Sequence, residues 1–196
     1  MSDAGVVAER IVPRRNTSAA QARVIGAALE LFARHGVGRT SLQMIADAVG
    51  VTKAAVYHQF RTKDEIVIAA AEAELASLEG VVDAAEAESS RTKARGVLVL
   101  GIVDLAVEHR RPVSIFLSDP DVVQYFAEHE PFRHVMDRLC RVLMGQTIGH
   151  EERVSTAILT AAISGVVMHP LVAGLDDDTL RSELQQLTRR LLPPMN

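Results

Sequence analysis

The chain has 196 residues, enough for one large domain or for a small module attached to a larger one. Hydrophobic residues make up 48% of it and charged residues 23%, a balance that excludes a mainly disordered chain. Aromatic residues reach only 4% and tryptophan is absent. The core must therefore consist of Ala, Val, Leu and Ile, which suit helix-on-helix packing.

The sequence has none of the features that would direct the chain to a membrane or an oxidising compartment. The single cysteine, Cys140, cannot form an internal disulfide, so the fold does not depend on an oxidising compartment. The first 15 residues lack the basic start and long apolar run of a signal peptide. The longest apolar stretch, residues 97–107, contains Asp104 and is too short to span a bilayer. We therefore expect a cytoplasmic protein with no membrane partner.

The charge of the chain is divided unevenly along its length. The formal net charge is −4, which by itself argues against a nucleic-acid partner. Residues 1–63, however, contain nine Lys and Arg against four Asp and Glu, whereas the remainder contains 12 against 21. A basic N-terminal third on an acidic body is typical of a module that meets phosphates.

Apolar residues recur at helical spacing through almost all of the chain after residue 17. Capping residues, glycines and prolines divide this pattern into segments. The predicted helices, about nine in all, cover residues 18–35, 41–49, 52–60, 62 into the 80s, 90–110, 119 onward, 131–145, 151–168 and 176–192. No alternating strand pattern is found, so the predicted fold class is all-α.

The two short predicted helices at 41–49 and 52–60 are joined only by Gly50 and Val51. So tight a join makes the helices cross steeply, as in a helix-turn-helix. The polar face of the second helix would then project Thr52, Lys53 and neighbouring residues outward. A small residue such as Ala55 on this face would let the helix approach base edges.

A longer stretch around this motif resembles a known family. Residues 22–70 resemble the DNA-binding domain of the TetR (tetracycline-repressor-like) family. The matching pieces are Ala28-Leu29-Glu30-Leu31-Phe32, His35-Gly36, Thr40-Ser41, Ile45-Ala46, Gly50-Val51-Thr52-Lys53, Val56-Tyr57, Phe60 and Lys63-Asp64-Glu65. Two positions depart from the usual pattern: Gln59 stands where His is common, and Arg61 where Pro or Gly is common.

The resemblance implies a three-helix DNA-binding head on a helical body that dimerises and holds an effector pocket. The expected domains are a flexible arm at 1–17, the helix-turn-helix domain at 18–65, and the ligand-binding and dimerisation domain at 66–196. The residues expected to meet DNA are Thr40, Ser41, Thr52, Lys53, Ala55, Tyr57, His58 and Lys63. For Arg14 and Arg15 of the arm there are two interpretations: they contact the minor groove, or they belong to a solvated basic tail.

Candidates for the two other sites come from the C-terminal two-thirds of the chain. Aromatic and methionine side chains make adaptable apolar walls. The effector-pocket candidates are His109, Phe116, Tyr125, Phe126, Met136 and Met168. A row of small residues in the penultimate helix would permit close approach of a second subunit, with internal packing as the alternative. The dimer-interface candidates are Ala157, Ala161, Gly165, Leu184, Leu187 and Leu191.

No catalytic motif, phosphate loop or zinc motif is present, so an enzyme is not expected and no cofactor is implied. His134 and Cys140 lie near other possible ligands, but surface or core roles are preferred over a metal or redox site. We expect a ligand-responsive repressor that binds a roughly palindromic operator as a homodimer and is released by a small apolar effector. The alternative is a helical small-molecule-binding scaffold with weak or lost DNA binding.

Overall fold

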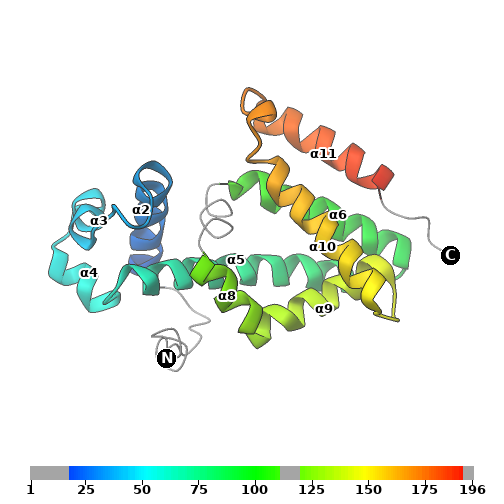
Figure 1. The fold of residues 1–196 in the computed structure, drawn as a ribbon, viewed down its shortest axis with the longest axis horizontal. Helices are drawn as coiled ribbons and strands as arrows, with labels where there is room; N and C mark the ends of the chain where they lie inside the picture. The colour runs from blue at the N-terminus through cyan, green and yellow to red at the C-terminus, as the bar shows by residue number, and fades with distance from the viewer. Residues whose placement is uncertain (1–17, 111–119, 192–196) are drawn as a thin grey trace. The chain divides into compact units, whose positions relative to one another are not determined.

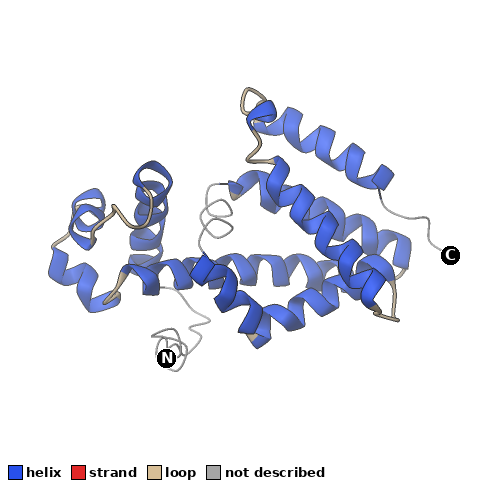
Figure 2. Ribbon diagram, in the orientation of Figure 1, coloured by secondary structure: helices blue, strands red, loops and turns tan. Residues whose placement is uncertain are grey.

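The computed structural model describes residues 18–110 and 120–191. The expectations placed on Arg14, Arg15 and Phe116 lie outside these residues. Within them the chain forms nine α-helices and one short 3-10 helix, with no strand (Figure 2). The predicted all-α fold class is therefore confirmed.

The observed helices agree closely with the predicted ones. The N-terminal helices are α2 (Ala19–His35), α3 (Leu42–Val49), α4 (Lys53–Gln59) and α5 (Lys63–Glu86). The others are α6 (Arg91–Glu108), α8 (Pro120–Glu128), α9 (Glu130–Met144), α10 (His150–Val166), η1 (Pro170–Val172) and α11 (Asp177–Leu191). The 3-10 helix η1 was not predicted, because its three residues are too few to show a period.

The chain divides into two compact units. The head unit comprises the described residues 18–74 and 120–128, and the body unit comprises 75–110 and 129–191. The expected domain boundary after residue 65 therefore falls inside α5, whose residues up to Glu74 group with the head. Helix α8 also groups with the head, although it lies far along the chain.

The head unit packs α2, α3 and α4 with the beginning of α5 around one apolar core (Figure 1). Each helix turns one apolar stripe inward. Val24, Ala28 and Phe32 come from α2, and Ile45 comes from α3; all four are at most 3% exposed. Val56 of α4 is completely buried. Since α3 and α4 have only 8 and 7 residues, they depend on this core and on their caps for stability.

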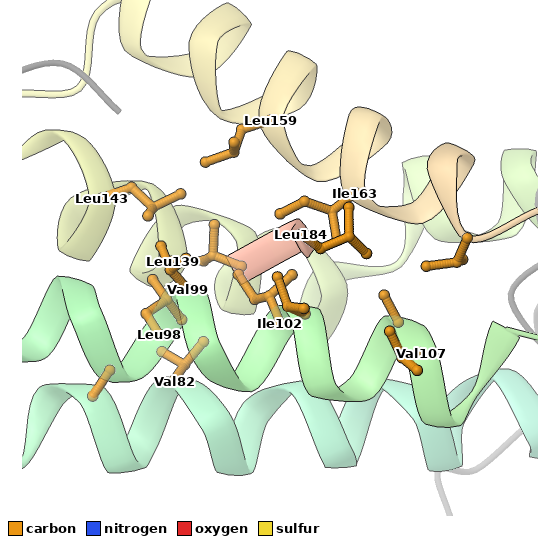
Figure 3. Packing of buried hydrophobic residues seen from close by; sticks show 14 of the residues in the cluster. Val82, Leu98, Val99, Ile102, Val107, Leu139, Leu143, Leu159, Ile163 and Leu184 are labelled. Carbon is orange, nitrogen blue, oxygen red and sulfur yellow. The ribbon is translucent and has the colours of Figure 1, made fainter. Parts of the chain in front are cut away.

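The body unit has its own core, in which α6 is the central helix (Figure 3). Helix α6 packs against α9, α10 and α11. The residues labelled in Figure 3 are Val82, Leu98, Val99, Ile102, Val107, Leu139, Leu143, Leu159, Ile163 and Leu184. All are aliphatic, as the scarcity of aromatic residues predicted.

Ion pairs between helices surround the body core. Arg181 of α11 reaches Asp104 at 3.1 Å and Glu108 at 3.8 Å, both on α6. Arg138 of α9 meets Asp83 at 2.5 Å and Glu86 at 2.6 Å, both on α5. These pairs join helices that are distant in sequence and so help to fix how the body helices pack.

Within the described ranges, no helix combines the length and the apolar character needed to cross a bilayer.

Candidate nucleic-acid interface

The join between α3 and α4 is closed by backbone hydrogen bonds around one glycine. Gly50 has φ +76° and ψ +34°, the left-handed conformation that glycine adopts at little cost. Its N–H donates to the carbonyls of Ala46 and Asp47, and the Val51 N–H donates to the Ala46 carbonyl at 3.0 Å. Only Gly50 and Val51 therefore separate α3 from Thr52, the N-cap of α4.

Two hydroxyl side chains begin the helices of this motif. Ser41 Oγ accepts a hydrogen bond from the Met44 N–H at 3.2 Å, and Thr52 Oγ1 accepts one from the Ala55 N–H at 3.2 Å. Loss of such a cap costs about 1 kcal/mol of helix stability. Ser41 and Thr52 nevertheless remain at the surface of the head unit, where a phosphate could also reach them.

The outer face of α4 carries the side chains that the sequence assigned to DNA. Lys53, Ala55, Tyr57 and His58 are all exposed, with Tyr57 at 49%, whereas Val56 points inward and is completely buried. The face therefore presents a cation, a methyl group, a phenol and an imidazole together. A helix of this composition offers donors to phosphates and small apolar contacts to base edges.

Arg61, just beyond α4, extends this face. Its guanidinium carbon lies 5.9 Å from the centre of the Tyr57 ring, within the range of a cation–π contact. Its N–H donates to the Glu65 carboxylate at 2.7 Å, which holds the turn into α5. Sequence reasoning treated Arg61 only as a departure from a pattern. The spacing of four residues from Tyr57 could have indicated the pairing.

Thr40, one of the residues expected to meet DNA, lies inside the head unit. Its side chain is only 2% exposed. Its hydroxyl donates to the Gly36 carbonyl at 2.9 Å, and its N–H donates to the Val37 carbonyl at 3.2 Å. Thr40 therefore stabilises the loop between α2 and α3 through two hydrogen bonds. In the free protein its hydroxyl is not exposed to solvent.

The ammonium group of Lys63 is also engaged inside the head unit. Nζ donates to the Val37 carbonyl at 2.7 Å and to the Gly38 carbonyl at 3.2 Å. Lys63 thus connects the first residue of α5 to the α2–α3 loop. The phosphate contact expected of Lys63 would compete with these two hydrogen bonds.

Arg39 is a candidate that sequence reasoning missed. It is exposed, and it lies between the loop carbonyls held by Lys63 and the N-cap of α3, Ser41. A basic residue two positions before the capped start of a helix-turn-helix is a visible signal in the sequence. It was overlooked because the adjacent Thr40 matched a family pattern and Arg39 did not.

The charge of residues 18–63, which contain the helix-turn-helix, favours a polyanionic partner. Residues 18–63 contain six Lys and Arg but only two acidic residues. Both acidic residues have local partners: Glu30 lies 3.9 Å from Arg34, and Asp47 accepts a hydrogen bond from Gln43 at 2.7 Å. Residues 18–63 therefore carry an excess of positive charge, whereas residues 64–74 and 120–128 of the same unit contain six acidic residues and no Lys or Arg.

The effector-pocket candidates are distributed over both units. Tyr125 and Phe126 of α8 belong to the head unit, where their ring centres lie 5.7 Å apart in an edge-to-face arrangement. The Tyr125 hydroxyl donates to Glu72 at 2.9 Å, and burial together with this bond raises the pKa of Tyr125 far above its usual range. Met136 packs against the body core, while Met168 is 44% exposed.

His109, another pocket candidate, forms the C-cap of α6 in the body unit. Its N–H donates to the Leu105 carbonyl at 2.8 Å. Neither unit by itself therefore brings the pocket candidates together, and their role in ligand binding stays a prediction.

The dimer-interface candidates differ in exposure. Ala157, Ala161 and Gly165 lie exposed along α10, and Leu187 of α11 is 49% exposed. Leu184, by contrast, is 6% exposed and belongs to the core of its own subunit. A side chain so deeply packed offers little surface to a partner. Leu191 is the last residue of α11, and its side chain lies outside the described ones.

Two exposed residues of α10 were missed as interface candidates. Val154 and Ile158 are 58% and 64% exposed, high values for large aliphatic side chains. They share the outer face of the helix with Ala157 and Ala161 at helical spacing. The spacing of four residues between Val154 and Ile158 is visible in the sequence, but the interface prediction used only the small residues of this helix.

Cys140 is buried, and its sulfur accepts a hydrogen bond from the Thr156 hydroxyl at 3.2 Å. His134 is exposed on the same helix. Among the side chains that the structure describes, no three His, Cys, Asp or Glu residues come close enough to hold a metal ion. Cys140 thus has the surroundings of a core residue.

Comparison with known proteins supports the helix-turn-helix assignment. The sequence model described as "Bacterial regulatory proteins, tetR family" matches residues 24–70. The HTH-type transcriptional regulator AcrR of Shigella flexneri is 26% identical over 170 residues, which cover 80% of this chain and 76% of AcrR.

Solved structures show the same fold over nearly the whole chain. A bacterial regulatory protein of the tetR family from Rhodococcus RHA1 superposes with a TM-score of 0.72 at 20% identity, covering 92% of this chain and all of that one. The structure titled "SmeT-Triclosan complex" gives a TM-score of 0.65 at 22% identity, covering 91% of this chain and 97% of that one.

The fold and the exposed, capped helix α4 define the class as a helix-turn-helix DNA-binding transcriptional regulator with a helical body. Residues 24–70 match the model of the tetR family of bacterial regulatory proteins, and the relative AcrR is similar over most of the chain. The resemblance predicted from residues 22–70 is confirmed at almost the same bounds.

Proposed function

We propose that the chain is a transcriptional repressor that binds a roughly palindromic operator as a homodimer and leaves it when a small apolar effector binds. The observation that carries the proposal is the outer face of α4, where Lys53, Ala55, Tyr57 and His58 are exposed around a buried Val56. In a helix-turn-helix protein, this face enters the major groove.

The residues of this face divide into two roles. Ala55 and Lys53 lie in the first turn of α4, which is the part of a recognition helix that contacts base edges. Ser41, Thr52, Tyr57 and His58 can donate to phosphates beside the groove. Arg61 adds a cation beyond the helix end. Phosphate contacts would set affinity and Ala55 would set sequence preference, while the Lys53 ammonium would contribute to both.

A gel-shift titration against the DNA upstream of the coding sequence tests DNA binding. Lys53→Ala should weaken binding, and the log–log salt dependence should lose about 0.9 of its slope if Lys53 contacts one phosphate. Arg133→Ala provides a matched control, since Arg133 is an exposed cation on α9 of the body unit. The control should bind as the wild type does.

Binding with no sequence preference at moderate salt, by a folded dimer, would contradict the repressor proposal. If the chain then still bound small molecules, the scaffold alternative would replace it. An unchanged salt slope in Lys53→Ala would remove Lys53 from the interface and leave the rest of the α4 face to be tested in the same way.

Dimerisation through α10 and α11 is supported by their exposed apolar residues. Val154 and Ile158 of α10 and Leu187 of α11 are 58%, 64% and 49% exposed, and Ala161 leaves room for a close helix. Two such subunits would place their heads in successive major grooves, about 34–36 Å apart.

Ile158→Arg should turn the dimer into a monomer in analytical ultracentrifugation, because a buried unpaired charge opposes association. Val123→Arg is the matched control, since Val123 is a 50% exposed aliphatic residue on α8. A monomeric wild type, or an Ile158→Arg protein that stays dimeric, would contradict this interface.

An apolar effector is supported by the body core, which consists of aliphatic side chains. The similar structure titled with SmeT was solved as a complex with triclosan, a small apolar molecule. Triclosan is therefore a suitable first probe. A rise in melting temperature and release of bound DNA at the same concentration would support the proposal. A panel of small apolar compounds, triclosan included, that changes neither quantity would contradict it.

A further inference from the structure

The loop between α2 and α3 has three successive carbonyl groups that all accept side-chain hydrogen bonds. The Gly36 carbonyl accepts from the Thr40 hydroxyl at 2.9 Å. The Val37 and Gly38 carbonyls accept from Lys63 Nζ at 2.7 and 3.2 Å. Together with the backbone bond from the Thr40 N–H to the Val37 carbonyl, these three bonds hold the loop.

Lys63 occupies an unfavourable place for a cation. It is the first residue of α5, where the partial positive charge of the helix end repels an ammonium group. Asp64 and Glu65 in the same turn have the sign that this position favours. The two loop carbonyls offset the repulsion, because a charged donor makes stronger hydrogen bonds than a neutral one. The ammonium is therefore directed to the loop rather than to solvent.

The link crosses the head unit. Lys63 and Val37 are 26 residues apart, so the bond ties the start of α5 to the loop that precedes α3. Thr40, buried at 2%, closes the same loop from its other end. Arg39 of the same loop is exposed, two residues before Ser41, the N-cap of α3.

We propose that Lys63 is a positioning residue for DNA binding, and that the residue it positions, Arg39, makes the phosphate contact. The inference rests on the proposed DNA-binding function. Lys63 acts from within the protein: its ammonium holds the Val37 and Gly38 carbonyls, and the held loop presents the Arg39 guanidinium beside the α3 N-terminus. Arg39 then supplies the charge that meets the DNA backbone.

A double-mutant cycle on DNA affinity tests the proposal. The probe is a duplex enriched from a random-sequence pool by the wild-type chain. Lys63→Met keeps the length of the side chain and removes its donors, while Arg39→Ala removes the proposed contact. Each single change should weaken binding about tenfold, the value of one charge-assisted hydrogen bond. The double variant should also lose about tenfold, rather than about 100-fold, because the two residues act through one contact.

Lys63→Arg and Lys53→Met are the matched variants. Lys63→Arg keeps a charged donor and should recover part of the lost affinity. Lys53→Met removes an exposed lysine of α4 and should combine additively with Arg39→Ala. If Lys63→Met were additive with Arg39→Ala as well, Lys63 would itself contact DNA and the proposal would be overturned.

Amide hydrogen exchange of the free protein gives a second test that needs no DNA. The Thr40 N–H, bonded to the Val37 carbonyl, should exchange faster in Lys63→Met than in the wild type or in Lys53→Met. The Ile45 N–H in α3 reports on the fold and should keep its protection. Unchanged exchange at Thr40, or equal loss of protection at both amides, would overturn local positioning by Lys63.

The two tests separate failure of this inference from failure of the proposed function. A wild-type chain that enriches no duplex would remove the DNA-binding function and, with it, the role of Arg39. The exchange measurement would still show whether Lys63 holds the loop. A chain that binds its duplex with additive losses would keep the function and overturn the inference.

Discussion

The helices of the head unit and those of the body unit are stabilised by different interactions. In the head unit, helices of 8 and 7 residues are begun by local caps, Ser41 and Thr52, and joined through Gly50. In the body unit, helices of 15 to 24 residues are held by an aliphatic core and by ion pairs between helices distant in sequence. Short helices need local termination signals, whereas long ones gain enough from tertiary packing.

This difference explains why the head could be interpreted in more detail than the body. A cap or a left-handed glycine leaves a signature within four residues of sequence. An ion pair such as Arg138 with Glu86 leaves none, because its partners are 52 residues apart. The following predictions test whether the two units are as distinct as this comparison states, beginning with the largest expected effect.

Matched core substitutions should separate the two units most strongly. Ile45 in the head and Leu139 in the body are both completely buried. Ile45→Ala and Leu139→Ala should each cost about 2–5 kcal/mol of local stability. Ile45→Ala should abolish DNA binding while most of the helical circular-dichroism signal survives. Leu139→Ala should lower the temperature at which most of that signal is lost. A single shared transition in both variants would show that the units do not unfold separately.

Two glycines with positive φ allow a comparison of backbone strain. Gly50 has φ +76° and open space around an added Cβ, so Gly50→Ala should cost about 1–2 kcal/mol. Gly145 has φ +116° with ψ −177°, a region almost restricted to glycine, and an added Cβ would lie 2.6 Å from Arg91 Nη2. Gly145→Ala should therefore cost about 1–3 kcal/mol, measured by urea unfolding. Equal losses at the two sites would contradict this ranking.

The Arg138 network should contribute measurably to the body unit. The hydrogen bonds that Arg138 donates, to Glu86 first and then to Asp83, raise its pKa above the ordinary value, so it stays charged at any pH at which the protein folds. Arg138→Met should cost about 1 kcal/mol, discounted because its carboxylate partners are exposed to solvent, and the loss should shrink at high salt. Arg153→Met, which breaks one exposed pair with Asp137, should cost less. A larger loss of stability in Arg153→Met than in Arg138→Met would contradict a stabilising role for the Arg138 network.

The Tyr125–Glu72 hydrogen bond joins residues that are 53 apart in the sequence but both in the head unit. Removing it shows whether the head unit depends on long-range contacts as well as on local caps. Tyr125→Phe should cost about 1 kcal/mol, since it removes one hydrogen bond to a carboxylate. Tyr57→Phe is the control for stability, because Tyr57 is 49% exposed. If Tyr125→Phe and Tyr57→Phe had the same melting temperature, α8 would not stabilise the head unit through this bond.

The smallest expected effect is the pH dependence of the cap on α11. Hydrogen bonds from the Thr179 N–H and hydroxyl hold the pKa of Asp176 below its ordinary 3.8. A depressed pKa stabilises the fold above 3.8, and the contribution is lost as the pH falls through the lower, folded value. The wild type should therefore be slightly more stable than Asp176→Asn at pH 6, with the difference vanishing in strong acid. A difference independent of pH would contradict this.

Much of the head and its recognition surface was predictable from sequence. The predicted helix at 18–35 and the outward set on α4 agree with the structure. Each depends on neighbours within one helical turn. The effector-pocket candidates were less predictable, because their spacing along the chain says nothing about which unit each helix joins. Helix α8 joined the head unit, and only three-dimensional packing could show this.

The sequence by itself determined where the helices begin and end, which faces turn inward, and which family the first 70 residues resemble. Caps, left-handed glycines and apolar periodicity are local, and the local chain carries them. Tertiary structure alone decided that Thr40 is buried, that Leu184 belongs to its own core, and that the Lys63 ammonium meets a loop 26 residues earlier. These outcomes depend on how helices pack against one another, because a side chain reaches a distant partner only where packing brings the two together.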